Sequence, residues 1–112
     1  MVNNNKYDEI YNKNYMILQN KSIDYLMNIL FNGTNSFLKS IAKDVIINDN
    51  RLEECYDKDE IDKFMDFLSI TELWYYRGSE NKLVQEIATE KLINVLCDAD
   101  AKFKRDQFHL IK

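Results

Sequence analysis

The densest group of chemically active side chains in this sequence is a run of carboxylates between residues 49 and 66. The run holds eight acids against three bases, a formal charge of −5, whereas the whole 112-residue chain carries −4. Carboxylates can bind metal ions, transfer protons or attract a basic partner, and their spacing decides among these roles. The acids are Asp49, Glu53, Glu54, Asp57, Asp59, Glu60, Asp62 and Asp66.

The spacing of these acids does not fit a calcium-binding EF-hand loop. A loop beginning at Asp57 would place Asp57 and Asp59 at ligand positions. Its sixth position, where a sharp turn needs glycine, is Asp62, and its twelfth, where glutamate is needed, is Leu68. Carboxylates that hydrolyse a substrate need a cleft holding them at a defined separation, and nothing in the spacing provides one. We therefore predict a solvated acidic face.

The chain has one histidine, His109, so every histidine-dependent mechanism would depend on a residue close to the end of the sequence. Arg105-Asp106-Gln107-Phe108-His109 resembles a shortened version of the Arg…His motif of helical HEPN-type ribonucleases. The resemblance covers these five residues and implies ribonuclease chemistry there. Three residues separate the arginine from the histidine, fewer than in that family. We interpret the segment as a solvated last helical turn.

The two cysteines, Cys55 and Cys97, indicate reduced thiols rather than a disulfide framework. Cys55 lies among Glu53, Glu54 and Asp57, whose negative charge predicts a raised thiol pKa and little thiolate chemistry. Cys97 falls near an apolar stripe, so we expect a small buried core residue. One histidine and two distant cysteines are too few ligands for a zinc site. We predict no catalytic residue, no metal and no cofactor, and hence no enzyme.

The sequence Leu73-Trp74-Tyr75-Tyr76-Arg77 is a second cluster of interest. Four large residues in a row cannot all face one core, so at least one aromatic side chain must be partly exposed on a helix. Trp, Tyr and Arg are the residue types that dominate interaction hot spots. Two interpretations stay open: the cluster packs at the end of a helix, or it contacts a partner.

The elements that must position these side chains are predicted to be α-helices. The chain contains no proline and only two glycines, Gly33 and Gly78, which lie where helix C-caps are wanted. Apolar residues recur at helical spacing along most of the sequence. This spacing predicts helices over about residues 6–31, 35–47, 57–77 and 79–110, with a polar connection over 48–56.

Local signals predict where these helices begin. The apolar stripe drifts out of phase across residues 19–22, so the first segment is either one helix or two, with Ser22 capping the second. Asp57 and Glu60 have the spacing of a capping box, which starts the third helix. A short strand over residues 69–76 is an alternative to the end of that helix.

The apolar stripes also predict which side chains form the core. Burial of these stripes predicts a single all-α domain over residues 1–112, a compact antiparallel bundle of four or five helices. The predicted core includes Tyr7, Ile10, Tyr11, Tyr15 and Leu18 of the first segment and Val84, Ile87, Ala88, Leu92, Val95, Leu96, Ala99 and Phe103 of the last.

The composition of the chain limits the cellular compartment and the kinds of partner that we expect. Fourteen aromatic residues in 112 supply enough apolar area for an ordinary core. The polar start of the chain lacks the apolar region of a secretory signal, and no apolar stretch reaches the length of a membrane helix. We therefore expect a cytoplasmic protein with no membrane partner. A pI near 5.0 argues against direct nucleic-acid binding, which usually requires a basic patch.

These observations lead to the hypothesis of a small acidic protein that neutralises a partner with a basic surface, such as a toxin, nuclease or defence effector. Immunity proteins and viral anti-defence inhibitors are similar to this chain in size, charge and composition. One alternative is a structural or regulatory helical subunit that self-associates or joins a nucleoprotein complex, and the oligomeric state stays open. Another is a virus-encoded helical modulator with a groove for amphipathic helices, although the sequence shows no groove signature. The candidate partner-binding residues are Asp49, Glu53, Glu54, Tyr56, Asp57, Asp59, Asp62, Trp74, Tyr75 and Tyr76.

Overall fold

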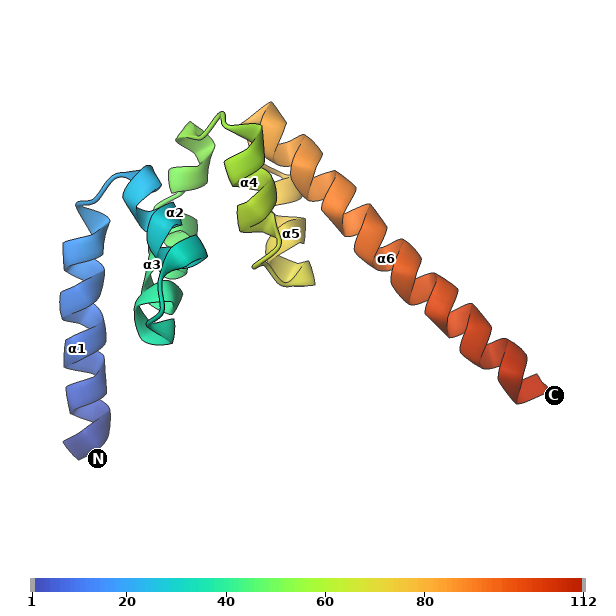
Figure 1. Ribbon diagram of the computed structural model, residues 1–112, viewed down its shortest axis with the longest axis horizontal. Helices are drawn as coiled ribbons and strands as arrows, with labels where there is room; N and C mark the ends of the chain where they lie inside the picture. The colour runs from blue at the N-terminus through green and yellow to red at the C-terminus, as the bar shows by residue number, and fades with distance from the viewer. Residues whose placement is uncertain (1, 112) are drawn as a thin grey trace. The chain divides into compact units, whose positions relative to one another are not determined.

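The computed structural model is all-α, as predicted (Figure 1). It describes the backbone of residues 2–111 and the side-chain environment of residues 6–97. Within the described backbone there is no strand, so the alternative for residues 69–76 is wrong. The helices are α1 (Val2–Gln19), α2 (Ile23–Asn32), α3 (Ser36–Asn48), the 3₁₀ helix η1 (Arg51–Glu54), α4 (Lys58–Met65), α5 (Ile70–Arg77) and α6 (Lys82–Ile111).

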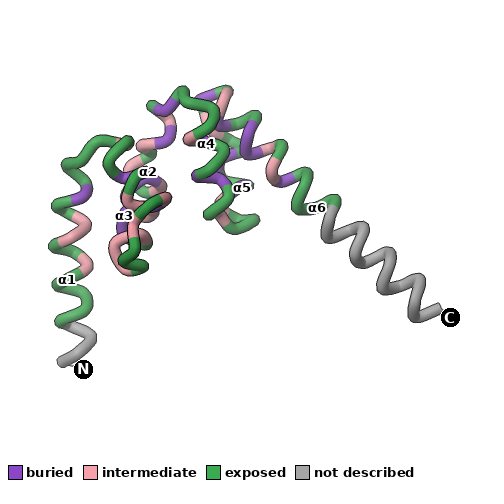
Figure 2. Tube along the Cα trace, in the orientation of Figure 1, coloured by how far each residue is buried: buried purple, intermediate pink, exposed green. Residues whose placement is uncertain are grey.

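The helices belong to two compact units, Met1–Glu60 and Ile61–Lys112. In the first unit α1 and α2 both pack on α3, and η1 packs against α3 as well. In the second unit α5 packs against α6. Each helix contributes buried positions, with the largest groups on α2, α3, α4 and the first half of α6 (Figure 2). The single domain expected over residues 1–112 stays a prediction.

Side-chain caps at Ser22, Asn35 and Asn81 mark the beginnings of α2, α3 and α6. The Ser22 hydroxyl accepts a hydrogen bond from the backbone N–H of Tyr25 at 3.2 Å, which confirms two helices in the first segment. Asn35 and Asn81 cap α3 and α6 in the same way. Each cap satisfies an N–H group that has no partner within its helix. The last helix therefore starts at Lys82, three residues later than predicted.

The continuous helix predicted over residues 57–77 is wrong, because α4 ends at Met65 and α5 begins at Ile70. A full capping box starts α5: the Ser69 hydroxyl accepts from the Glu72 N–H, and the Glu72 carboxylate accepts from the Ser69 N–H. The two bonds satisfy both backbone groups at the new helix start. This signal is present in the sequence and was outweighed by the apolar spacing.

The break also allows an aromatic contact in the core of the second unit. The rings of Phe64 and Tyr76, both fully buried, meet edge to face with centroids 6.3 Å apart. On one continuous helix, twelve residues would separate these positions by roughly 18 Å along the axis. The turn between α4 and α5 thus stabilises the core by letting these two large side chains pack together.

Helix α1 buries less of its apolar stripe than predicted. Leu18 is buried and Tyr11 and Tyr15 are half-buried, but Tyr7 and Ile10 are 57% and 52% exposed. The main packing partner of α1 is α3, and one neighbouring helix covers only a narrow face. The burial predicted for Tyr7 and Ile10 is therefore wrong.

Two tyrosine hydroxyls connect α1 to α3. The Tyr11 hydroxyl donates to Asp44 Oδ2 at 2.6 Å, and the Tyr15 hydroxyl donates to Asp49 Oδ1 at 3.2 Å. Burial, and then the hydrogen bond to Asp44, raise the pKa of the Tyr11 phenol well above its ordinary value. The phenol therefore stays protonated and keeps its donor role.

Helix α6 is buried along the first part of its predicted stripe and exposed further on. The burial of Val84, Ile87, Ala88 and Leu92 is confirmed. Val95 and Leu96 are 39% and 45% exposed, and Cys97 is exposed, so their predicted burial is wrong. Ala99 and Phe103 lie outside the described side chains. The exposed positions follow the last buried one, where α6 extends beyond its contact with the core.

Candidate functional site

The acidic segment, defined as Glu53–Asp59, joins η1 to α4 in the first unit. Leu52 and Cys55 are buried and anchor this stretch of chain. The residues that follow point outward, and Tyr56 is 75% exposed, with Asp57 and Asp59 exposed beside it. The segment therefore presents an aromatic ring among carboxylates on the surface of the unit.

Asp57 has a structural role as the predicted cap of α4. Its Oδ1 accepts hydrogen bonds from the backbone N–H groups of Asp59 at 3.0 Å and Glu60 at 3.2 Å. The Glu60 carboxylate accepts from the Cys55 thiol, with Sγ 3.7 Å from Oε2. Asp57 is thus exposed, but its replacement would also weaken the start of α4.

Burial and neighbouring charge shift two titrating groups at this helix start. Burial, followed by the negative charges of Asp24 and Asp57, raises the pKa of the Glu60 carboxyl. Burial is also the main cause that raises the pKa of the Cys55 thiol, with the charge of Glu60 adding to it. The prediction of a raised thiol pKa is confirmed, and its main cause is burial rather than charge. Cys55 is therefore a poor nucleophile.

Glu60→Gln is expected to flatten the pH dependence of stability and to stabilise the protein at neutral pH. Because the folded state raises the Glu60 pKa above its ordinary value of 4.5, the folded protein binds this proton more tightly than the unfolded chain. The stability gained from that proton is present at low pH and is lost as pH rises through the raised pKa. Urea denaturation from about pH 4 to about pH 7 measures the effect. A variant whose stability still falls with pH as steeply as that of wild type would contradict this assignment.

Three other candidate acids are partly or wholly engaged in their own unit. Asp49 accepts the hydrogen bond from Tyr15, and Glu53 is half-buried. In the second unit Lys91 Nζ lies 3.3 Å from Asp62 Oδ1 and 2.7 Å from Asp66 Oδ1. These contacts give the acids structural roles that the sequence did not reveal.

Glu54 and Asp59 are the acids of the segment best suited to meet a partner. Both are exposed. Neither carboxylate makes an ion pair or hydrogen bond with the part of the chain that the structure describes. Their charges can therefore be changed with little expected effect on the fold.

The three neighbouring aromatic residues of α5 differ sharply in exposure. Trp74 and Tyr75 are 48% and 57% exposed, which confirms that the cluster cannot be buried as a whole. Tyr76 is 1% exposed and belongs to the core, so we withdraw it as a partner-contact residue. The guanidinium carbon of Arg77 lies 4.8 Å from the centre of the Trp74 ring, a cation–π contact.

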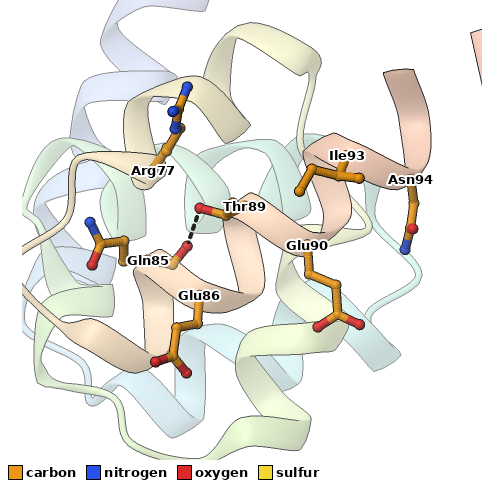
Figure 3. A pocket seen from close by; sticks show the side chains of 7 residues that line it. All are labelled: Arg77, Gln85, Glu86, Thr89, Glu90, Ile93 and Asn94. Atoms are coloured by element: carbon orange, nitrogen blue, oxygen red, sulfur yellow. Dashed lines mark hydrogen bonds between the residues drawn. The ribbon is translucent and has the colours of Figure 1, made fainter. Parts of the chain in front are cut away.

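An open pocket of about 520 Å³ lies beside this cluster in the second unit (Figure 3). Arg77 of α5 contributes one edge, and α6 contributes the rest. The Thr89 hydroxyl donates a hydrogen bond to the Gln85 backbone carbonyl one turn earlier on α6, at 2.8 Å. Sequence reasoning missed this site, although two glutamates one helical turn apart were a visible signal. The α6 residues that line it are Gln85, Glu86, Thr89, Glu90, Ile93 and Asn94.

Among the described side chains, no group of three or more His, Cys, Asp or Glu residues is arranged to hold a metal ion. Within the same part of the chain, no helix combines the length and the apolar character needed to cross a membrane. The segment Arg105–His109 lies outside the described side chains.

The chain was compared with protein families, curated proteins and solved structures. No protein-family model, no curated protein and no solved structure matches this chain.

Proposed function

We propose that this protein is a small acidic binding protein that neutralises or inhibits a partner protein with a basic surface. The observation that carries the proposal is the exposure of Tyr56, at 75%, between the exposed carboxylates of Glu54 and Asp59. An exposed aromatic ring offers a contact anchor, and the surrounding charges attract a basic surface. Trp74 and Tyr75 of the second unit are further exposed anchors.

The distribution of charge supports the same proposal. The first unit contains ten acids and seven bases, a net charge of −3, and the second contains nine acids and eight bases, a net charge of −1. Most of the excess negative charge therefore lies in the unit that carries the acidic segment. Such an imbalance speeds the encounter with a positively charged partner and makes its rate depend on salt.

Neutralisation needs no chemistry by this protein. A toxin, nuclease or defence effector with a basic active surface would lose its activity when the acidic segment covered that surface. The proposed role is consistent with the raised pKa of the Cys55 thiol, which disfavours its use as a nucleophile.

The double variant Glu54→Lys/Asp59→Lys is expected to slow association with the partner by about tenfold at low salt and to weaken the salt dependence. Each change adds +2, so the formal net charge moves from −4 to 0. The partner would first be captured from the native host with the wild-type protein. Association rates would then be measured with purified components between about 50 and about 200 mM salt.

A matched control separates the acidic segment from net charge alone. Asp8→Lys/Glu9→Lys changes the charge by the same amount at two exposed positions on α1 of the same unit. The control is expected to keep most of the association rate. If both double variants slow association equally, or if neither does, the acidic segment is not the contact surface. Asp57 and Asp62 are avoided because their replacement would also disturb the fold.

One observation favours the alternative of a self-associating helical subunit. Ile93, Val95 and Leu96 are exposed along α6, and such apolar positions are often covered by another chain. Sedimentation equilibrium distinguishes the two functions. A mass that rises with concentration would support the subunit, and a strict monomer would count against it. We further propose that the helices of the whole chain form a single antiparallel bundle.

A further inference from the structure

The pocket between α5 and α6 has an apolar side formed by Ile93, and the Trp74 ring lies next to its edge residue Arg77. Ile93 is 54% exposed, although its neighbour Leu92 is buried in the core. Arg77 lines the pocket and at the same time stacks on the half-exposed ring of Trp74. The pocket and the Trp74 ring are therefore parts of one surface, which lies wholly within the second unit.

The other side of the pocket is negatively charged, with two carboxylates against the one guanidinium of Arg77 at its edge. Glu86 and Glu90 lie one helical turn apart, and their side chains point to the same side of α6 (Figure 3). Like charges at this spacing repel each other and destabilise a helix. Neither carboxylate has an ion pair or hydrogen bond within the described residues. A cationic ligand would relieve the repulsion between the two carboxylates.

We propose that this surface docks an amphipathic helix that carries Lys or Arg residues along one flank of its apolar face. Apolar side chains of that helix would cover Ile93 and the Trp74 ring, and its basic side chains would pair with Glu86 and Glu90. The proposal concerns the second unit alone and does not require the acidic segment to bind anything.

The spacing of the pocket residues supports a helical occupant. Glu86, Glu90 and Ile93 follow one another at i, i+4 and i+7, the spacing at which the ridges of a second helix pack into a helix surface. An extended peptide usually adds to the edge of a sheet, and residues 2–111 contain no strand. Charge complementarity then selects a basic helix over an acidic one.

Trp74 is the only tryptophan of the chain, so its fluorescence reports directly on this surface. The probe is a Leu/Lys amphipathic helical peptide of about 18 residues without aromatic side chains, long enough to form a helix when bound. Its titration into the full-length protein is expected to shift the Trp74 emission and to saturate. A scrambled Leu/Lys peptide of identical composition and a Leu/Glu amphipathic peptide are expected to produce no saturable shift.

Charge reversal at the pocket is the decisive variant. Glu86→Lys/Glu90→Lys is expected to weaken binding of the Leu/Lys peptide by at least about tenfold, because two attractive pairs become repulsive. Glu54→Lys/Asp59→Lys changes the net charge equally in the other unit and is expected to leave the affinity unchanged. Far-UV circular dichroism checks that both variants remain helical.

Four results would overturn the proposal. They are the absence of a saturable shift, equal binding of the scrambled peptide, equal weakening by both double variants, and an emission shift that depends on protein concentration without peptide. The last result would assign the surface to a second copy of this chain. Three of these results, all but the equal weakening by both double variants, do not bear on association through Glu54 and Asp59, so the two proposals can fail separately.

Discussion

Replacement of Tyr76 by alanine is expected to lower the free energy of unfolding by about 3–5 kcal/mol, the cost of removing a large aromatic side chain from a core. Tyr75→Ala is expected to change it by less than about 1 kcal/mol. The two residues are identical in type and adjacent in sequence, but Tyr76 is 1% exposed and Tyr75 is 57% exposed. The two substitutions therefore differ mainly in how far the replaced tyrosine side chain is buried.

Urea denaturation, followed by far-UV circular dichroism and by Trp74 fluorescence, measures both variants. Tyr76→Phe keeps the ring that packs edge to face with Phe64 and is expected to retain most of the stability lost in Tyr76→Ala. Equal losses in Tyr75→Ala and Tyr76→Ala would contradict the assignment of Tyr76 to the core. They would also restore Tyr76 as a candidate contact residue.

The second large effect is expected at Gly33, where replacement by alanine should lower the free energy of unfolding by about 1–3 kcal/mol. A Cβ atom at this position would collide with the backbone carbonyl oxygen of Ile29. The Gly33 N–H donates a hydrogen bond to the same oxygen at 2.9 Å, so the chain cannot move away without loosening the end of α2. The need for glycine comes from this close approach, because φ is −68°.

Gly78→Ala is the matched control at the end of α5. The nearest atom to a Cβ there is the Tyr75 carbonyl oxygen at 3.6 Å, an ordinary contact distance. Alanine also restricts the unfolded chain, so we expect a neutral effect or a gain of up to about 1 kcal/mol. Urea midpoints of the two variants decide the comparison. A Gly33→Ala protein as stable as Gly78→Ala would show that the end of α2 has room to relax.

The helical class and several helix starts could be predicted from the sequence. The capping residues Ser22 and Asp57 accept hydrogen bonds from backbone N–H groups within three residues, so their effect is local and can be predicted from the neighbouring sequence. The sequence prediction missed the division between α4 and α5, although Ser69 and Glu72 have the residue types and spacing of a capping box. Apolar spacing continued across that box, and only the packing of Phe64 on Tyr76 decides that the chain turns there.

The candidate surfaces were predictable only in outline. The sequence located the acidic segment and required an exposed aromatic residue near Trp74. It could not tell which carboxylates are engaged, because their partners lie far away along the chain: Tyr15 and Asp49 are 34 residues apart. The pocket beside Glu86 and Glu90 was missed for the same reason, since Arg77 reaches it only in the folded unit.

The sequence by itself therefore determined the helical class, the local excess of negative charge and several helix starts, because propensity, charge and capping act over a few neighbouring residues. The tertiary structure decided that Tyr76 is core and Tyr75 surface, and that Asp62 pairs with Lys91 while Asp59 remains exposed. Those outcomes depend on which distant side chains meet when the helices pack. Of the run of eight acids, the folded units thus leave Glu54 and Asp59 as the clearest positions for a partner to recognise.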